Sequence, residues 1–277
     1  MKQKKIKNVL TIAGSDPSGG AGIQADLKSF SANGVYGMSV ITALTAQNTK
    51  GVSSIHSLPK DFILDQLNSI FNDIQVDAVK IGMIANSLIS ETIANFLHIK
   101  KAVNIVLDPV MVAKGGAKLL EDDAISSIKS NLMPISTIVT PNLPEASILS
   151  ETKEASSQDE MIIQGKALLN YGANSIFIKG GHLKGIFSPD LLVLKKDLLW
   201  FNSKKIKTKN THGTGCTLSS AIAANLSKGF DISKAVKDAK DYVYGAIKYA
   251  DNLDVGSGNG PTHHFHSVWQ NKLVIRG

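Results

Sequence analysis

Short apolar runs rich in β-branched residues alternate with amphipathic helical patterns along most of the 277 residues, and this alternation restricts the fold more than any other feature. The runs are continuously apolar, which is typical of parallel strands buried on both faces. Each connecting helix then packs on one face of the sheet. The sequence therefore predicts an α/β fold with a mostly parallel central sheet flanked by helices on both faces, a three-layer α/β/α arrangement.

The predicted elements follow one another with short connections. Strands are expected at residues 9–13, 39–46, 78–81, 104–107, 137–140 and 175–179, with a hairpin of residues 191–193 and 199–201. Helices are expected at residues 21–32, 60–73, 87–98, 121–131, 160–171, 216–227 and 233–249. Because no repeat, low-complexity segment or linker interrupts this order, residues 1–277 are predicted to form a single domain.

Glycine and polar residues follow the predicted strands at their carboxyl ends. In open parallel sheets the ligand crevice lies beyond these ends. The residues in question are Gly14 to Asp16, Gln47, Gly82 and Met83, Asp108, Thr140 to Asn142, and Lys179 to Gly181. We therefore expect the functional site at this edge of the sheet.

The first glycine-rich segment lies between Gly14 and Ala25. Its start has Walker A spacing, but Gly20 and Ala21 occupy the positions of the Lys and Ser/Thr, so a P-loop is excluded. Residues 20–25 also match the fingerprint G-x-G-x-x-A, without the acidic residue expected ~20 positions later. Both a tight strand-to-helix turn and a ligand-contacting loop fit this segment.

The second glycine-rich segment, Thr211 to Thr217, directly precedes a helix of small residues. Gly213 and Gly215 allow successive N–H groups to converge at the helix N-terminus, which predicts an anion hole. At such a position the thiolate of Cys216 is expected to be favoured, so that it serves as a general base or nucleophile. The alternative is a small buried hydrophobic residue.

Three charged residues lie at or just after predicted strands. Asp108 and Glu145 are suitable partners for Mg²⁺ through water, because this ion takes only one or two carboxylates. For Glu145 a first-turn helix charge is an alternative. Lys179, followed by two glycines, is a candidate phosphate binder.

Arg276 is the only arginine among 30 basic residues, against 23 acidic ones. Any phosphate must therefore be bound by lysine, a metal ion or backbone N–H groups. The net charge of +7 raises the question of nucleic acid, and lysine runs occur at Lys2 to Lys7 and Lys204 to Lys209. Neither run has interleaved aromatic residues, which favours a solvated surface over nucleic-acid binding.

Targeting signals and disulfides are not expected. The apolar run at residues 9–13 is too short for a signal peptide, and no stretch approaches the ~20 apolar residues of a membrane helix. Cys216 is the only cysteine, which excludes an intramolecular disulfide and favours a reducing compartment. We therefore expect a cytoplasmic protein without a membrane partner.

Eight segments together resemble the ribokinase superfamily and, within it, the hydroxymethylpyrimidine/phosphomethylpyrimidine kinases. These segments are residues 13–28, 42–49, 80–83, 108–111, 140–146, 179–182, 211–217 and 260–266. They run in family order, so the resemblance covers essentially the whole chain.

The resemblance implies a ribokinase-like, ATP- and Mg²⁺-dependent kinase of thiamine diphosphate biosynthesis. It would phosphorylate 4-amino-5-hydroxymethyl-2-methylpyrimidine (HMP) to HMP phosphate and then to HMP diphosphate. By position it implies pyrimidine contacts at Gly14, Asp26, Gln47, Met83 and Val110, nucleotide contacts at Lys179, Lys240, Thr140 and Asn142, Mg²⁺ partners at Asp108 and Glu145, and a catalytic loop of Gly213, Thr214, Gly215 and Cys216. Ribokinase-like sugar kinases carry Asp where Cys216 stands, which leaves its role as a base open.

Three other functions are weighed against this one. A pyridoxal kinase is the nearest, but the Gln47 carboxamide matches the amino group and ring nitrogen of an aminopyrimidine, and pyridoxal has no such edge. Thiol hydrolysis by Cys216 and His212 lacks an orienting third residue. Nucleic-acid binding rests on charge alone. A homodimer is expected, as the commonest symmetric assembly.

Overall fold

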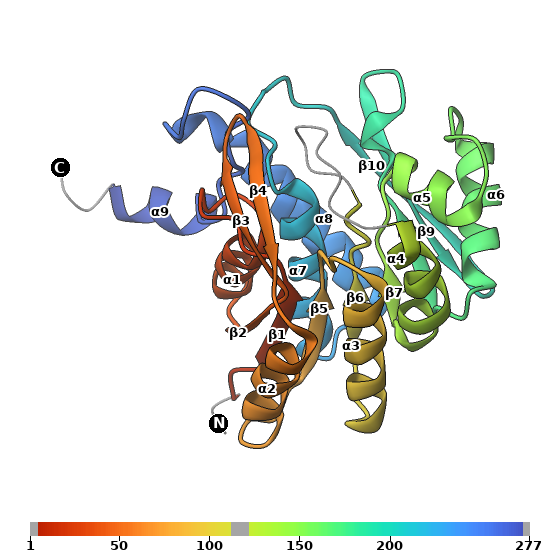
Figure 1. Ribbon diagram of the computed structural model, residues 1–277. Helices are drawn as coiled ribbons and strands as arrows, with labels where there is room; N and C mark the ends of the chain where they lie inside the picture. Colours follow the sequence, from red (N-terminus) through yellow and green to blue (C-terminus); the bar gives the residue numbers. More distant parts are fainter. Residues whose placement is uncertain (1–4, 112–121, 274–277) are drawn as a thin grey trace.

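The structure is a computed structural model that describes residues 5–111 and 122–273 (Figure 1). Its centre is a sheet in the order β10-β9-β8-β7-β6-β5-β1-β2. The parallel strands are β1 (Asn8–Ala13), β2 (Tyr36–Ile41), β5 (Ala78–Ile81), β6 (Ile105–Leu107), β7 (Ile138–Val139) and β8 (Ser175–Ile178). Strands β9 (Phe187–Leu194) and β10 (Leu198–Lys204) extend the sheet in antiparallel fashion and include the predicted hairpin. The predicted mostly parallel sheet is confirmed.

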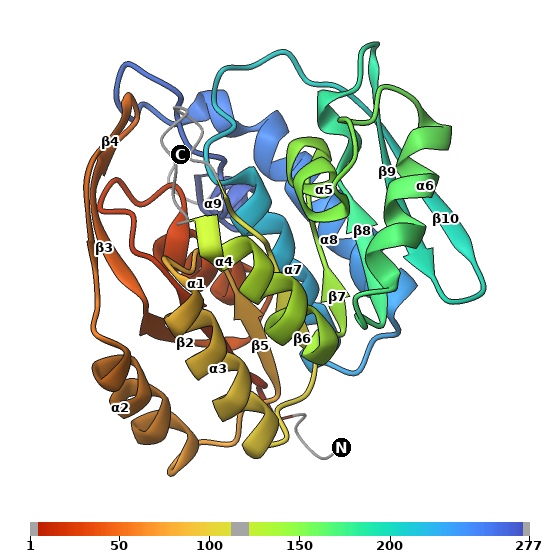
Figure 2. The same ribbon diagram turned by 45° about the vertical axis from the view of Figure 1, so that its right-hand side comes forward.

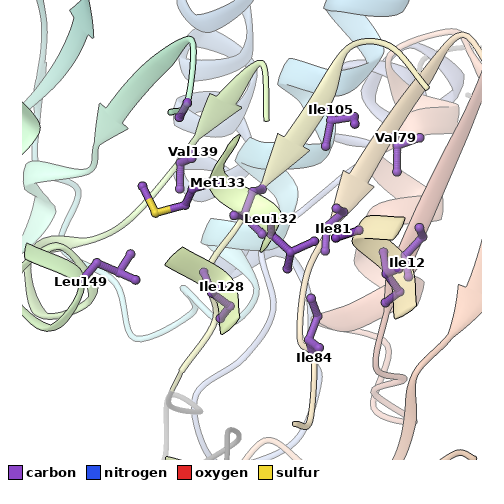
Figure 3. Close-up of a cluster of buried hydrophobic side chains, with 14 of the residues drawn as sticks. Ile12, Val79, Ile81, Ile84, Ile105, Ile128, Leu132, Met133, Val139 and Leu149 are labelled. Carbon is purple, nitrogen blue, oxygen red and sulfur yellow. The ribbon is translucent and has the colours of Figure 1, made fainter. Parts of the chain in front are cut away.

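Helices cover both faces of this sheet (Figure 2). One face carries α2 (Lys60–Phe71), α3 (Ser87–Ile99), α4 (Asp122–Ser127), α5 (Leu143–Ser150) and α6 (Gln158–Leu169), and the other α1 (Gly22–Ala32), α7 (Thr214–Ser227) and α8 (Ile232–Lys248). Within β1, Ile12 packs into the first core, which Figure 3 shows with Val79 and Ile81, and Val9 packs into the second. Alternate residues of one strand thus enter different cores, which explains the continuously apolar runs.

A separate two-stranded sheet consists of β3 (Ala43–Asn48) and β4 (Gly51–Ser57). The predicted single strand at residues 39–46 is therefore wrong, because the chain leaves the main sheet at Thr42. The buried Thr42 hydroxyl donates to the Met83 carbonyl, and its N–H donates to the Ala13 carbonyl. β4 was not predicted because its residues are mostly exposed and lack an apolar pattern.

Two helices were not predicted, and two short turns extend the region after α4. Helix α5 was missed, although Asn142 and Glu145 form a capping box at its start. Helix α9 (His266–Leu273) was missed as well. The π-helical turn Ile128–Leu132 and a 3₁₀ turn (Met133–Ile135) follow α4. Glu121, Arg276, Lys2 and Lys4 lie outside the described residues.

No helix in residues 5–111 or 122–273 combines the length and the apolar character that crossing a membrane requires.

Candidate functional site

A cavity of about 770 Å³ lies beyond the carboxyl ends of the parallel strands, where α7 begins. Most of the predicted site residues line it: Gly14, Gln47, Met83, Val110, Asp108, Asn142, Glu145, Lys179, Lys240 and Gly213 to Cys216. Asp26 and Thr140 do not line it. The fold therefore brings segments from across the chain to the edge of the sheet at which the strand pattern predicted a site.

The start of α7 is built around Gly213, which has the left-handed backbone angle φ 75°. A Cβ atom at Gly213 would lie 1.7 Å from the Gly20 carbonyl oxygen, so no other residue fits without rearrangement. Gly215 and Cys216 follow in the first turn, where N–H groups have no intrahelical acceptor. A Cβ at Gly215 would lie 3.3 Å from Lys179 Nζ. The helix N-terminus thus presents the N–H groups of Gly215 and Cys216 and its positive dipole end beside Lys179.

Lys179 lies between two carboxylates. Its Nζ donates to Asp108 Oδ1 at 2.9 Å and lies 3.8 Å from Glu145 Oε2. Burial alone would raise the pKa of Asp108, but Lys179 and Lys80 hold it below its usual value. Burial would lower the pKa of Lys179, but Asp108 and Glu145 raise it. The cluster therefore contains a firmly ionised pair at the edge of the cavity.

Glu145 has two roles in this cluster. Its Oε2 accepts from the Asn142 N–H at 2.7 Å, and its own N–H donates to Asn142 Oδ1 at 2.8 Å, which closes the capping box of α5. Burial, followed by repulsion from Asp108, raises its pKa to about 7 despite the attraction of Lys179. The helix-cap role and the cavity-lining position are thus both present.

The two carboxylates of Asp108 and Glu145 suit a hydrated Mg²⁺, which takes one or two carboxylates and keeps several waters. Both line the same cavity beside Lys179. Among the described residues, no group of three or more His, Cys, Asp or Glu side chains could hold a metal ion directly. The donor set therefore fits an ion held through water better than a fully protein-coordinated metal.

Thr140 is fully buried, and its hydroxyl lies 3.3 Å from Asp108 Oδ1. Ser219 of α7 donates to the other carboxylate oxygen at 3.3 Å. Both hydroxyls orient Asp108, so Thr140 acts on the site through Asp108.

Asp26 is also fully buried and does not reach the cavity. Its carboxylate accepts from the Thr11 hydroxyl at 2.6 Å, the Ser220 hydroxyl at 2.7 Å and Lys80 Nζ at 2.9 Å.

Lys80 does line the cavity, although it is fully buried from solvent. Burial would lower the pKa of Lys80, but Asp26 and then Cys216 and Asp108 raise it. Sequence reasoning missed this lysine as a site residue, although a charged residue in the apolar strand β5 was a usable signal.

The prediction that the thiolate of Cys216 is favoured is wrong, because its surroundings favour the protonated thiol. Its pKa is raised to about 11, first by burial and then by the charges of Asp26 and Asp108, which outweigh Lys80 and the Gly22 N–H. The prediction considered only the helix N-terminus and could not include the carboxylates of Asp26 in α1 and Asp108 after β6. At neutral pH the residue is therefore a thiol.

Lys240 of α8 donates to Asp190 Oδ2 at 2.5 Å and to the Ser188 carbonyl at 3.2 Å. Asp190 also accepts from the Gly180 N–H at 2.8 Å, and both charged residues line the cavity. Burial raises the pKa of Asp190, and Lys240 opposes this. Sequence reasoning had no signal for Asp190, because it lies within the hairpin and its role depends on α8 packing against it.

His212 and Asp16 complete the cavity wall. His212 Nε2 lies 2.8 Å from Asp16 Oδ2 and 3.3 Å from Gln47 Nε2. Asp16 also accepts from the N–H groups of Ser18 and Ala21, at 2.8 Å each. Burial would raise its pKa, but the bonds from His212 and Ser18 lower it to about 2.

The first glycine-rich segment forms a tight turn, and this turn lies at the cavity wall. Gly22 has φ 54°, and a Cβ there would lie 2.4 Å from the Gly14 carbonyl oxygen, as a tight turn requires. Gly14 and Gly22 also line the cavity, so the same turn is positioned to contact a ligand.

Comparison with known proteins identifies the family to which the chain belongs. The family model for phosphomethylpyrimidine kinase matches residues 16–263. The hydroxymethylpyrimidine/phosphomethylpyrimidine kinase of Escherichia coli (strain K12) is 49% identical over 262 residues, which are 95% of this chain and 98% of that protein. The crystal structure of phosphomethylpyrimidine kinase from Clostridium difficile 630 is similar with a TM-score of 0.78 and 44% identity, over 88% of this chain and 100% of that one. An ADP complex of Bacillus subtilis pyridoxal kinase has a TM-score of 0.87 and 39% identity, over 94% of this chain and 98% of that one.

Proposed function

Because this chain belongs to the phosphomethylpyrimidine kinase family, we propose that it transfers the γ-phosphoryl group of ATP to HMP and then to HMP phosphate, as a step of thiamine diphosphate biosynthesis. The observation that carries this proposal is the start of α7 facing Lys179 and Asp108 in a cavity that also contains Gln47. Anion-binding N–H groups, a phosphate-binding cation and an amide suited to an aminopyrimidine are thereby combined in one site.

The pyrimidine is proposed to lie against Gly14, Gln47, Met83 and Val110. Met83 and Val110 supply apolar cover for the ring, and the Gln47 carboxamide supplies the acceptor and donor for its amidine edge. Asp26 supports this region only indirectly, through the Lys80 ammonium that it holds.

The phosphates of ATP are proposed to contact Lys179, Lys240 and the N–H groups of residues 213–216. These groups stabilise the charge that develops on the transferred phosphoryl group, which is the main contribution a kinase can make to a loose transition state. Asn142 and Thr140 support the nucleotide side through Glu145 and Asp108. Asp108 and Glu145 would hold Mg²⁺ through its waters, and the bound ion would neutralise phosphate charge.

Cys216 is proposed to orient the hydroxymethyl group and not to deprotonate it beforehand. A thiol with a pKa of about 11 is a poor base at neutral pH. A loose phosphoryl-transfer transition state needs little base assistance, so Cys216 only has to hold the attacking hydroxyl by a hydrogen bond. The hydroxyl proton would pass to an oxygen of the transferred phosphoryl group as the new O–P bond forms and the bond to ADP breaks.

The test is an ATP-consumption assay with purified protein that follows HMP phosphate and HMP diphosphate separately. We expect turnover of HMP to exceed that of pyridoxal, because pyridoxal offers no amidine edge to Gln47. The fold does not discriminate, since a pyridoxal kinase shares it. A strong preference for pyridoxal would refute the proposed substrate.

Residues 1–277 are further proposed to act as one kinase domain in a cytoplasmic homodimer. Exposed apolar residues on the edge strand β2 and on the hairpin β3–β4, namely Tyr36, Leu44 and Ile55, support a subunit contact there. Light scattering coupled to gel filtration measures the assembly, and a monomer at micromolar concentration would argue against it.

A further inference from the structure

The hairpin β3–β4 carries Gln47 on two strands that lie outside the main sheet. Its residues are mostly half-buried or exposed, and a two-stranded hairpin alone is only marginally stable in water. At its base the hairpin is bound to the turn after β1: the Ser15 N–H donates to the Ala43 carbonyl at 2.9 Å, and Thr45 Oγ1 donates to the Ser15 carbonyl at 2.8 Å. The position of Gln47 therefore also depends on what holds the tip of the hairpin.

The tip is held by residues 256–262, the tether, which follow α8 in the chain (Figure 2). The Gly258 N–H donates to Thr49 Oγ1 at 3.1 Å, and the Asn259 N–H donates to the Thr49 carbonyl at 2.8 Å. The two chains approach so closely that a Cβ at Gly258 would lie 2.1 Å from that carbonyl oxygen. Thr49 comes two residues after Gln47, so the tether fixes the hairpin next to the proposed pyrimidine contact.

The other end of the tether is bound to the loop that precedes α7. The Gly260 carbonyl accepts from the His212 N–H at 2.9 Å, and the Gly260 N–H donates to Asn210 Oδ1 at 3.1 Å. His212 directly precedes Gly213, the N-cap of α7. One short segment thus connects the hairpin near Gln47 with the residue before Gly213.

We propose that the tether, together with Thr49 and Asn210 at its two ends, positions Gln47 relative to the start of α7. Among the described residues that line the cavity, none belongs to the tether, so it acts on the site through the hairpin and the loop before α7. These contacts also give a role to the start of segment 260–266, which resembles the family but provides none of the proposed ligand contacts.

The consequence for catalysis rests on the proposed function, in which Gln47 binds the pyrimidine and residues 213–216 bind the transferred phosphoryl group. The separation of these two groups then decides whether the hydroxyl of a bound pyrimidine reaches the phosphorus atom. Reacting atoms must approach to about 3–3.5 Å, and a misplacement of about 1 Å costs on the order of a hundredfold in rate. The tether therefore selects substrates by the distance between the recognised ring edge and the reacting hydroxyl.

Substitutions at Thr49 test the hairpin end of the tether. Thr49→Val removes the acceptor of the Gly258 N–H, so kcat/KM for HMP should fall at least about fivefold. The dissociation constant of ADP should stay within about twofold of the wild type, because the proposed nucleotide contacts lie on other elements. Thr49→Ser keeps the hydroxyl and should keep kcat/KM. The matched control is Ser53→Ala, which loses a hydrogen bond within the same hairpin, to the Ala46 carbonyl at 2.9 Å, and should also keep it.

Asn210→Ala tests the other end, because it removes the acceptor of the Gly260 N–H. Although Asn210 does not line the cavity, kcat/KM for HMP should again fall at least about fivefold. A connection fails when either end is released, so Thr49→Val combined with Asn210→Ala should lose at most about twice as much as the more impaired single variant. The control is Asp251→Ala, which removes the partner 2.8 Å from Asn210 Nδ2 and should keep kcat/KM.

Three results would overturn the inference: losses that multiply in the double variant, wild-type kcat/KM in both single variants, or an ADP affinity that falls as much as kcat/KM does. Hydrogen exchange gives a readout that needs no substrate. In Asn210→Ala the amides of residues 43–57 should exchange at least about fivefold faster than in the wild type, and unchanged exchange would overturn the inference. A wild-type protein that does not phosphorylate HMP, with faster exchange in Asn210→Ala, would refute the proposed function and support the inference.

Discussion

Cys216 is the only cysteine of the chain, so the state of its thiol can be measured without a label. The thiolate is the reactive form, and a pKa of about 11 against the ordinary 9.0 leaves far less of it near neutral pH. At pH 8 we expect alkylation by iodoacetamide about a hundredfold more slowly than that of an ordinary free cysteine, with the rate rising about tenfold per pH unit. Mass spectrometry of the intact protein follows the reaction.

The control for this measurement is the same protein in urea, where Cys216 should react at the ordinary rate. Ordinary reactivity of the native protein at neutral pH would contradict the raised pKa. It would also restore the role of Cys216 as a general base.

The buried pair of Lys80 and Asp26 gives a prediction about stability. Asp26→Asn leaves the buried Lys80 ammonium without its ion-pair partner, so the free energy of unfolding should fall by about 3–5 kcal/mol. The double variant Lys80→Met with Asp26→Asn removes both charges, so its free energy of unfolding should fall by less. Urea unfolding measures the free energy of unfolding of the single and the double variant. The exposed pair of Lys237 and Asp241 is the control, and Asp241→Asn should barely change stability. Equal losses in the single and double variants would show that the charge pair is not the cause.

At the scale of elements, the two ends of α7 offer a matched comparison. Gly213 and Gly229 flank the helix with φ 75° and 83°, but only a Cβ at Gly213 meets other atoms. Gly213→Ala should reduce kcat by about a hundredfold or more, because the N–H groups of residues 213–216 lose their alignment. Gly229→Ala should cost about 1–2 kcal/mol of stability from its left-handed backbone and keep kcat.

Steady-state kinetics and thermal unfolding of the two variants separate these effects. A Gly213→Ala variant with unchanged kcat would remove the anion hole from the mechanism. Loss of kcat in Gly229→Ala would show that helix strain alone impairs turnover.

Elements whose bounds are set by the local sequence pattern were predicted well. Elements whose bounds are set by contacts with residues distant in the sequence were not. Strand β6 and helices α1, α3 and α8 lie close to their predicted ranges, because their apolar patterns are local. The break at Thr42 was missed because it is set by bonds to Met83 and Ala13, which are distant in sequence or on another strand.

At the scale of the whole molecule, Glu145 makes stability depend on pH. Its pKa is about 7 in the fold against the usual 4.5, so the folded protein binds this proton more tightly than the unfolded chain does. The resulting stabilisation is fully present below about pH 4.5 and is lost as the pH rises through about 7.

Without nucleotide or Mg²⁺, the free energy of unfolding should therefore fall more between about pH 5 and pH 8 in the wild type than in Glu145→Gln. Urea unfolding at several pH values measures the two slopes. Glu91→Gln, exposed on α3, is the control and should follow the wild type. Parallel curves for the wild type and Glu145→Gln would contradict the raised pKa.

The sequence by itself determined the layered α/β fold and the edge of the sheet at which the site lies, because continuously apolar strands require helices on both faces and strand ends collect the polar residues. It also predicted the glycine-containing loop at the start of α7, since glycine spacing before a helix is a local property. Only the tertiary structure decided the charge of Cys216, the burial of Asp26 behind Lys80 and the contact of Asp16 with His212. These features depend on electrostatic and hydrogen-bonding partners from distant segments, and a pattern along one chain does not specify which of them meet.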